Sequence, residues 1–265
     1  MPNQAFIVGV TSQNPESGEA MMPVAGPASQ AMANIVMDTG IYSDVTRVSD
    51  WNGDAITREE ILNGLRSMVE QAEPGDNLFF SFTGRGAQAE GQGGDLEEDG
   101  MNEVMWAFDG PITDNEIRDI LAELPEGVNM TLAFDQEHAG GMADLQLGEG
   151  LAANIVSIGA TTSDGTIWAN EDRTQFVGLL EEVMAENPGL SWNDAVALMN
   201  SRVPDEYPQH IVLDASNPEL LDKQILTLRD ETTPLASDAL LDAQAAVDNA
   251  QDADAAVDDA CDCDC

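Results

Sequence analysis

Two short segments combine glycines with side chains that could do chemistry. Gly84-Arg85-Gly86 follows one apolar run, and Gln136-Glu137-His138 begins a Gly-containing loop after another. A cation, a carboxylate and an imidazole in two loops could bind or polarise a substrate. Glycines beside polar residues also make simple tight turns, and the spacing alone favours that interpretation.

Other groups suited to metal or nucleophilic chemistry are few. His138 and His210 are the only histidines, no cysteine precedes residue 261, and a zinc site would therefore need carboxylates, so both histidines are expected to be structural. Cys261, Cys263 and Cys265 alternate with Asp at the end of the chain. They could bind a soft metal or form a disulfide with another chain, but an exposed, inert tail is the default expectation.

Acidic residues dominate the composition, with 50 Asp and Glu against 9 Lys and Arg and a net charge of -41. This charge repels nucleic acid and anionic membranes, so neither is expected as a partner. The acids are spread along the chain, which favours a salt-adapted, halophile-like surface over one acidic site for basic partners. No long apolar run and no signal peptide are visible, which predicts a soluble cytoplasmic protein.

The elements that must position the two loops follow from hydrophobic patterning. Short apolar runs alternate with helical patterns, which is typical of a mostly parallel sheet with crossover helices. Thr57 with Glu60 and Thr113 with Glu116 have the spacing of capping boxes at helix starts. Strands are predicted at residues 5–10, 45–48, 77–83, 129–135, 154–160 and 210–213. Both polar loops therefore leave the carboxyl ends of strands, where open α/β sheets place functional residues.

The composition predicts one domain and a tail. A chain of 265 residues with 43% hydrophobic residues can bury one substantial core, which we place in residues 1–232. Residues 233–265 contain nine Asp and no basic residue, within Ala/Asp-rich low complexity. An acidic, solvated tail is expected there.

Several blocks resemble the metacaspase (caspase-like, peptidase C14) family in order and spacing, across about residues 4 to 215. They are residues 74–86, 95–109, 112–116, 124–127, 135–140, 143–145 and 207–210. The resemblance implies a caspase-like α/β fold, with a mostly parallel six-stranded sheet flanked by helices. It also implies that the strands ending at Thr83 and Asp135 are adjacent.

The catalytic positions depart from the family pattern. In the family, the His of Gly-His-Gly activates the Cys of Asp-Ser-Cys-His-Ser-Gly, and the thiolate attacks a peptide carbonyl. The matching residues here are Arg85 and Glu137, neither of which can take over those tasks near neutral pH. The backbone N–H groups of Gly86 and Glu137 match the oxyanion hole. The resemblance thus implies a degenerate site, in which we predict an ion pair between Arg85 and Glu137.

Features of substrate recognition are partly kept. Asp135 matches the family's acidic residue that holds a substrate Arg or Lys, and Thr83 lies beside it in the expected pocket. Gln30 stands where the family has a second acidic contributor, so that charge is lost. A protein or basic peptide partner remains the expectation.

Some metacaspases bind calcium through carboxylates that flank the active site. The matching positions are Asp99, Asp114, Asn115 and Asp144, whose oxygen atoms suit Ca²⁺. An acidic solvated loop is the competing interpretation.

Three functions follow as hypotheses. The first is a catalytically inactive metacaspase-like protein that binds or regulates a partner. The second is an active endopeptidase that cleaves after Arg or Lys with an unusual constellation, such as Glu137 or Asp135 with His138. The third is a structural or assembly protein that reuses the fold, since a fold alone does not confer function. The oligomeric state is not predicted.

Overall fold

A computed structural model describes residues 3–12, 21–90, 101–145, 147, 150–187, 189–207 and 209–228. The tail at residues 233–265, with its three cysteines, lies outside these ranges, as does Asp99. None of the described helices is long and apolar enough to cross a membrane.

The predicted α/β architecture, with a mostly parallel six-stranded sheet, is confirmed. The strand order is β2-β1-β3-β7-β8-β9, and every pairing is parallel except that of β8 with β9. The strands are β1 (Gln4–Gly9), β2 (Asp44–Ser49), β3 (Asn77–Thr83), β7 (Asn129–Asp135), β8 (Asn154–Gly159) and β9 (Val212–Ala215). Strands β3 and β7 read as apolar runs because helices cover both faces of the sheet.

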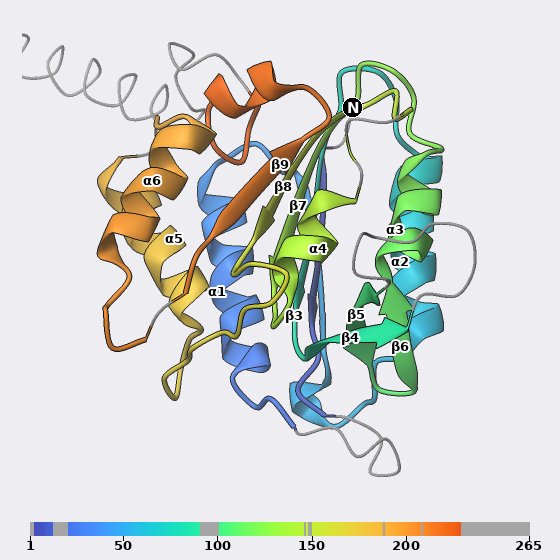
Figure 1. Cartoon of the computed structure of the whole chain (residues 1–265). Helices are drawn as coiled ribbons and strands as arrows, with labels where there is room; N and C mark the ends of the chain where they lie inside the picture. Colours follow the sequence, from blue (N-terminus) through green and yellow to red (C-terminus); the bar gives the residue numbers. More distant parts are fainter. Residues whose placement is uncertain are drawn as a thin grey trace, which may run out of the picture.

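Helices lie on the two faces of this sheet (Figure 1). One face carries α1 (Ala25–Asp38), α5 (Gln175–Glu186) and α6 (Trp192–Arg202), and the other carries α2 (Arg58–Glu70) and α3 (Asp114–Leu121). The short helix α4 (Ala139–Asp144) packs against β7, β8 and β9. Two short 3-10 helices span Asp50–Asn52 and Pro218–Asp222.

Both predicted capping boxes are present. The side chain of Thr57 accepts the Glu60 backbone N–H while Glu60 bonds back to Thr57, and Thr113 and Glu116 repeat this arrangement. The apolar faces that follow them are buried. Each cap satisfies backbone donors that a helix start would otherwise leave unpaired.

The last strand differs from its prediction at residues 210–213. Strand β9 begins at Val212 and ends at Ala215. Ahead of it, the backbone of Ile211 is paired with the side chain of Asn200, so it does not join the sheet. The apolar pattern of the sequence does not indicate that the Ile211 backbone groups form hydrogen bonds with a side chain of α6 instead of with a neighbouring strand.

A second, three-stranded sheet was not predicted. It consists of β4 (Gly86–Glu90), β5 (Met101–Ala107) and β6 (Gly110–Thr113), in the order β4-β5-β6 with antiparallel pairing. Strand β4 begins directly at the Gly84-Arg85-Gly86 segment, so this sheet fixes the direction of that loop.

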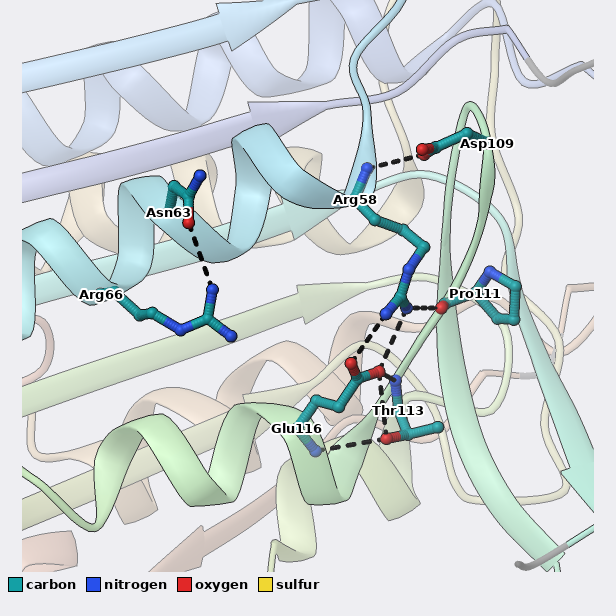
Figure 2. Close-up of polar contacts among 7 residues, drawn as sticks. All are labelled: Arg58, Asn63, Arg66, Asp109, Pro111, Thr113 and Glu116. Carbon is teal, nitrogen blue, oxygen red and sulfur yellow. Dashed lines mark hydrogen bonds and ion pairs between the residues drawn. The ribbon is translucent and has the colours of Figure 1, made fainter.

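Arg58 ties this small sheet to the helices (Figure 2). Its guanidinium contacts both Glu116 oxygens, at 2.7 and 3.1 Å, and donates to the Pro111 carbonyl, while its backbone N–H donates to Asp109 at 2.7 Å. Burial opposes ionisation of Glu116, but hydrogen bonds from Arg58 and Thr113 lower its pKa overall. Hydrogen bonds of Arg58 therefore connect the starts of α2 and α3 with the β5–β6 turn.

A ladder of asparagine side chains crosses the sheet at the amino ends of its parallel strands. Asn154 donates to the side-chain oxygen of Asn129 at 2.9 Å, and Asn129 donates to Asn77 at 3.2 Å. The side-chain oxygen of Asn3 then accepts the Asn77 backbone N–H at 2.9 Å. Asn77, Asn129 and Asn154 stand opposite one another in register, so each amide can serve as donor and acceptor to its neighbours.

Candidate functional site

The two polar loops leave adjacent strands, as predicted. Thr83 of β3 is opposite Asp135 of β7 in parallel register, at the carboxyl edge of the sheet. The Gly84 N–H donates to the Asp135 carbonyl at 3.3 Å, and the Arg85 carbonyl accepts the Trp106 N–H at 2.9 Å. Main-chain bonds thus hold the first loop between the large and small sheets.

Arg85 and Glu137 form the predicted ion pair. A guanidinium nitrogen of Arg85 lies 2.5 Å from Oε1 of Glu137, with 29% and 15% of the two side chains exposed. Oε2 of Glu137 accepts the backbone N–H of Gly86 at 3.2 Å. One carboxylate therefore binds both the cation and the backbone donor of the opposite loop.

The close approach of the loops requires glycine at position 86. A Cβ atom there would lie 1.9 Å from the Glu137 carbonyl oxygen, which is closer than non-bonded atoms can approach. The neighbouring Gln136 is fully buried, and its amide nitrogen donates to the Val104 carbonyl of the small sheet at 3.1 Å. The second loop, which follows β7 of the large sheet, is thus also bound to the small sheet.

Asp135 is buried at the base of the site, with 1% of its surface exposed. Burial raises its pKa to about 7, and the charge of Glu137 adds to this shift, whereas the hydroxyls of Thr174 and Thr83 partly oppose it. The Thr174 hydroxyl donates to Oδ2 of Asp135 at 2.7 Å. This carboxyl group therefore changes its charge near neutral pH.

Thr174 is a site residue that the sequence interpretation missed. Its side chain also accepts the Val177 N–H, which caps the start of α5. A Thr ahead of an apolar helical run is a recognisable capping signal. Nothing in the sequence indicates that the same hydroxyl reaches Asp135, because 39 residues separate the two.

Gln30 is the third residue predicted for the pocket, and it belongs to α1. It is on the exposed side of α1, and its amide donates to Asn34 at 3.1 Å. Its neighbour Ser29 is fully buried and accepts a hydrogen bond from Arg47 at 3.2 Å. Thr83 and Asp135 are brought together by strand register, and the pocket role of Gln30 stays a prediction.

His138 is held by the loop that follows β8. Its Nδ1 lies 2.6 Å from the Ser163 carbonyl, and its backbone N–H donates to the Gly165 carbonyl at 3.1 Å. A carbonyl can only accept, so Nδ1 carries the proton in this contact. These contacts fix the second loop from its far side, while His210 is exposed ahead of β9.

Three of the four residues matched to calcium ligands, Asp114, Asn115 and Asp144, lie in the described part of the chain. Asp114, buried in the first turn of α3, accepts the Asn115 N–H at 2.7 Å, and Asp144 is exposed at the end of α4. Within the described ranges, no group of three His, Cys, Asp or Glu side chains could hold a metal ion. Asp99 lies outside those ranges, and calcium binding stays a prediction.

Comparison with solved structures supports the fold. A crystal structure of a Geobacter sulfurreducens protein superposes with a TM-score of 0.68, at 19% identity, over 86% of this chain and all of that one. At this level of identity the match shows the shared fold alone.

Curated relatives match less than half of the chain. Metacaspase-1 of Saccharomyces cerevisiae is 38% identical over 117 residues, which is 42% of this chain and 25% of the relative. A protein named inactive metacaspase-4 from Trypanosoma brucei brucei is 41% identical over 92 residues, which is 34% of this chain and 26% of the relative. The match therefore spans about a quarter of each relative's length.

The model of the metacaspase, peptidase C14 domain matches residues 4–146. This segment contains β1, β3 and β7 and both polar loops, including Arg85 and Glu137. It is also more than half of the chain. The chain therefore belongs to the metacaspase (peptidase C14) family.

Proposed function

We propose that this protein is a catalytically inactive member of its family that acts by binding a protein or a basic peptide. The observation that carries the proposal is the double contact of the Glu137 carboxylate with the Arg85 guanidinium and the Gly86 N–H. At the positions of the catalytic dyad, a closed ion pair replaces a base and a nucleophile.

Each part of this arrangement opposes acyl transfer. Arginine stays protonated and cannot accept a proton from a nucleophile, and a carboxylate is a poor acyl-transfer nucleophile beside a thiolate. The Glu137 carboxylate also occupies the Gly86 N–H, which in the family pattern would donate to the oxyanion. Its negative charge would repel an oxyanion formed beside it.

Recognition of a basic side chain is supported by what remains at the base of the site. Asp135 stands at the family's position for holding Arg or Lys, and the raised pKa means that a bound cation would favour its ionised form. One relative's name describes it as inactive, so loss of activity has a parallel within the family.

A peptidase assay tests the proposal. The full chain is incubated with peptides that carry Arg or Lys before the scissile bond, with and without calcium, beside the Glu137→Ala variant. We expect no turnover above that of the variant. Turnover by the wild type that Glu137→Ala abolishes would favour the active-peptidase alternative, in which Glu137 or Asp135 works with His138.

A matched control addresses access to the site. The double variant Arg85→His with Glu137→Cys replaces both incompatible side chains with the family's residue types. Any turnover in this variant shows that the peptide reaches the site. The lack of turnover by the wild type would then be due to the chemistry of Arg85 and Glu137.

A further inference from the structure

A polar hollow lies between the loop that follows β8 and the connection from α6 to β9. Its volume is about 420 Å³, within the usual range for sites that bind small groups. The loop contributes Thr161 and Gly165 to its lining, and the connection contributes Val203, Pro204, Asp205 and His210. The dyad positions and the buried carboxyl group at the base of the family site do not line it.

Thr161 places a hydroxyl at this hollow from a buried position. The residue is only 2% exposed, and no hydrogen bond is found for its side chain with any other described residue. A Cβ atom at position 165 would clash with the Thr161 hydroxyl oxygen, so Gly165 is required for that hydroxyl to lie where it does. Because buried polar groups are nearly always hydrogen-bonded, the Thr161 hydroxyl points to a ligand group that would complete its bonds.

The rim of the hollow carries a negative charge. Asp205 is exposed, no ion pair is found for its carboxylate among the described residues, and none of the described Lys or Arg residues lines the hollow. The exposed His210 adds an imidazole, whose neutral form has one nitrogen that accepts. The hollow therefore offers a carboxylate, a hydroxyl and an imidazole as acceptors, which favours a cation that carries several N–H donors.

One part of the lining is apolar. Val203 and Pro204 follow directly after α6 and lie between the helix and Asp205 in the chain. Aliphatic side chains of this kind can contact the methylene stem of a long cationic side chain, whose charged head then reaches the polar groups.

Hydrogen bonds of two amide side chains hold the walls of the hollow together. The buried Gln209 donates to the Ala160 carbonyl at 2.8 Å and accepts the Trp168 N–H at 3.1 Å. Asn200 bonds to both backbone groups of Ile211 at 2.9 Å. The two segments are thus fixed relative to each other before any ligand binds, which lowers the entropic cost of binding.

We propose that this hollow binds a primary alkylammonium group, that of a lysine side chain in a partner protein. The ammonium would donate to the Thr161 hydroxyl and the Asp205 carboxylate, with the His210 imidazole as a third acceptor. Its methylene stem would lie against Val203 and Pro204.

The hollow shares a wall with the site at the dyad positions. The His138 N–H donates to the Gly165 carbonyl at 3.1 Å, and Nδ1 of His138 lies 2.6 Å from the Ser163 carbonyl. One loop therefore borders both sites, so a partner with two basic side chains could contact both. The proposal for the hollow does not depend on the proposed function, because it requires neither Asp135 nor the ion pair above it.

Titration of the full chain, followed by proton–nitrogen correlation NMR, tests the site. The probes are N-acetyl-lysine N-methylamide, its trimethylammonium form, and the norleucine analogue, which has the same stem and no nitrogen. The trimethyl form keeps the charge but has no N–H donors. We expect the lysine probe to bind at least about fivefold more tightly than either of the others, because its hydrogen bonds are lost in both.

n-Butylammonium distinguishes a lysine side chain from a free amine. It has the same head and stem without the peptide groups, and we expect it to bind within about threefold of the lysine probe. Binding of n-butylammonium without binding of the lysine probe would assign the hollow to free amines and overturn the proposal.

Variants assign the binding to named groups. Thr161→Val keeps the shape of the side chain and should weaken binding of the lysine probe about fivefold, whereas Thr161→Ser should retain it. Asp205→Asn should weaken binding by about fivefold or more. Glu206→Gln is the matched control, because it removes the same charge from the neighbouring exposed residue, which does not line the hollow, and should change binding by less than about twofold.

Three results would contradict the proposal. The first is binding of the trimethyl form as tightly as the lysine probe, and the second is unchanged binding in the folded Thr161→Val and Asp205→Asn variants. The third is an equal loss in Asp205→Asn and Glu206→Gln, which would show general attraction of cations to an acidic chain. The peptidase assay on the same preparation reports on the proposed inactivity independently.

Discussion

The two ends of the central sheet carry different chemistry, although the same strands run between them. At the amino edge, Asn77, Asn129 and Asn154 pair with one another through neutral amides. At the carboxyl edge, six residues further along β3 and β7, Asp135 is buried with a raised pKa, and Arg85 and Glu137 close over the strand ends.

The difference shows how one sheet separates stability from recognition. Amides satisfy each other without a net charge, so the amino edge costs little to desolvate. The carboxyl edge holds an ionisable group that burial penalises, and a ligand with the opposite charge would relieve that penalty. We therefore expect substitutions at the amino edge to act on stability alone.

The largest expected effect is that of Asp135→Asn on the free energy of unfolding. The folded-state pKa of about 7 lies above the ordinary Asp value of 3.8, so the folded state retains a proton that the unfolded chain releases. Stability from this group is therefore lost as pH rises from about 4 to about 7. At pH 8 we expect the variant to be more stable than the wild type by on the order of 3 kcal/mol.

Denaturant unfolding at several pH values measures this effect. The difference between the two proteins should be smallest near pH 4 and should level off above pH 7. Thr174→Val is the matched control, because it removes the hydroxyl that favours the ionised form and should destabilise most at high pH. A pH-independent difference for Asp135→Asn would mean that the carboxyl group titrates normally.

The next largest effect is the coupling between Arg85 and Glu137. Both side chains are partly exposed, so the pair should be worth more than a surface pair and less than a fully buried one. In a double-mutant cycle with Arg85→Ala and Glu137→Ala, we expect a coupling of about 1–3 kcal/mol. A coupling near zero would show that the closed site contributes no stability.

At the amino edge, the effect should depend on the position in the ladder. Asn129→Ala breaks two side-chain bonds and should cost about 1–2 kcal/mol, whereas Asn154→Ala breaks one of the bonds in this ladder and should cost about half as much. Thermal unfolding measures both. Neither variant should alter the coupling between Arg85 and Glu137, and a change there would break the division between the two edges.

The smallest expected effect is a difference in salt response. With a net charge of -41, the wild type should be stabilised as NaCl rises from about 0.05 M to about 1 M, because salt screens like-charge repulsion. Asn129→Ala should gain the same amount, to within about 0.5 kcal/mol, since the ladder is uncharged. A melting temperature of the wild type that does not change with salt would remove the halophile-like interpretation.

Many elements of the site could be predicted from the sequence, because strands and helix starts are determined by short stretches of residues. The run from Asn77 to Thr83 and the run from Asn129 to Asp135 predicted strands that end in polar loops, and the family resemblance implied that these strands are adjacent. Capping spacing located α2 and α3. The match of Arg85 and Glu137 to the family's facing dyad, together with their opposite charges, then predicted their ion pair.

The tertiary structure decided what depends on contacts between distant segments. The Thr174 hydroxyl reaches Asp135, the Arg58 side chain reaches Pro111 of β6, and Trp168 meets Tyr207, in each case across about 40 residues or more. The shift of β9 has the same origin, because Asn200 takes the backbone bonds of Ile211. Periodicity and capping are determined within one or two helical turns, so the sequence alone specifies the elements and their ends. The pairing of particular side chains, and the burial that moves a pKa, exist only once those elements are packed.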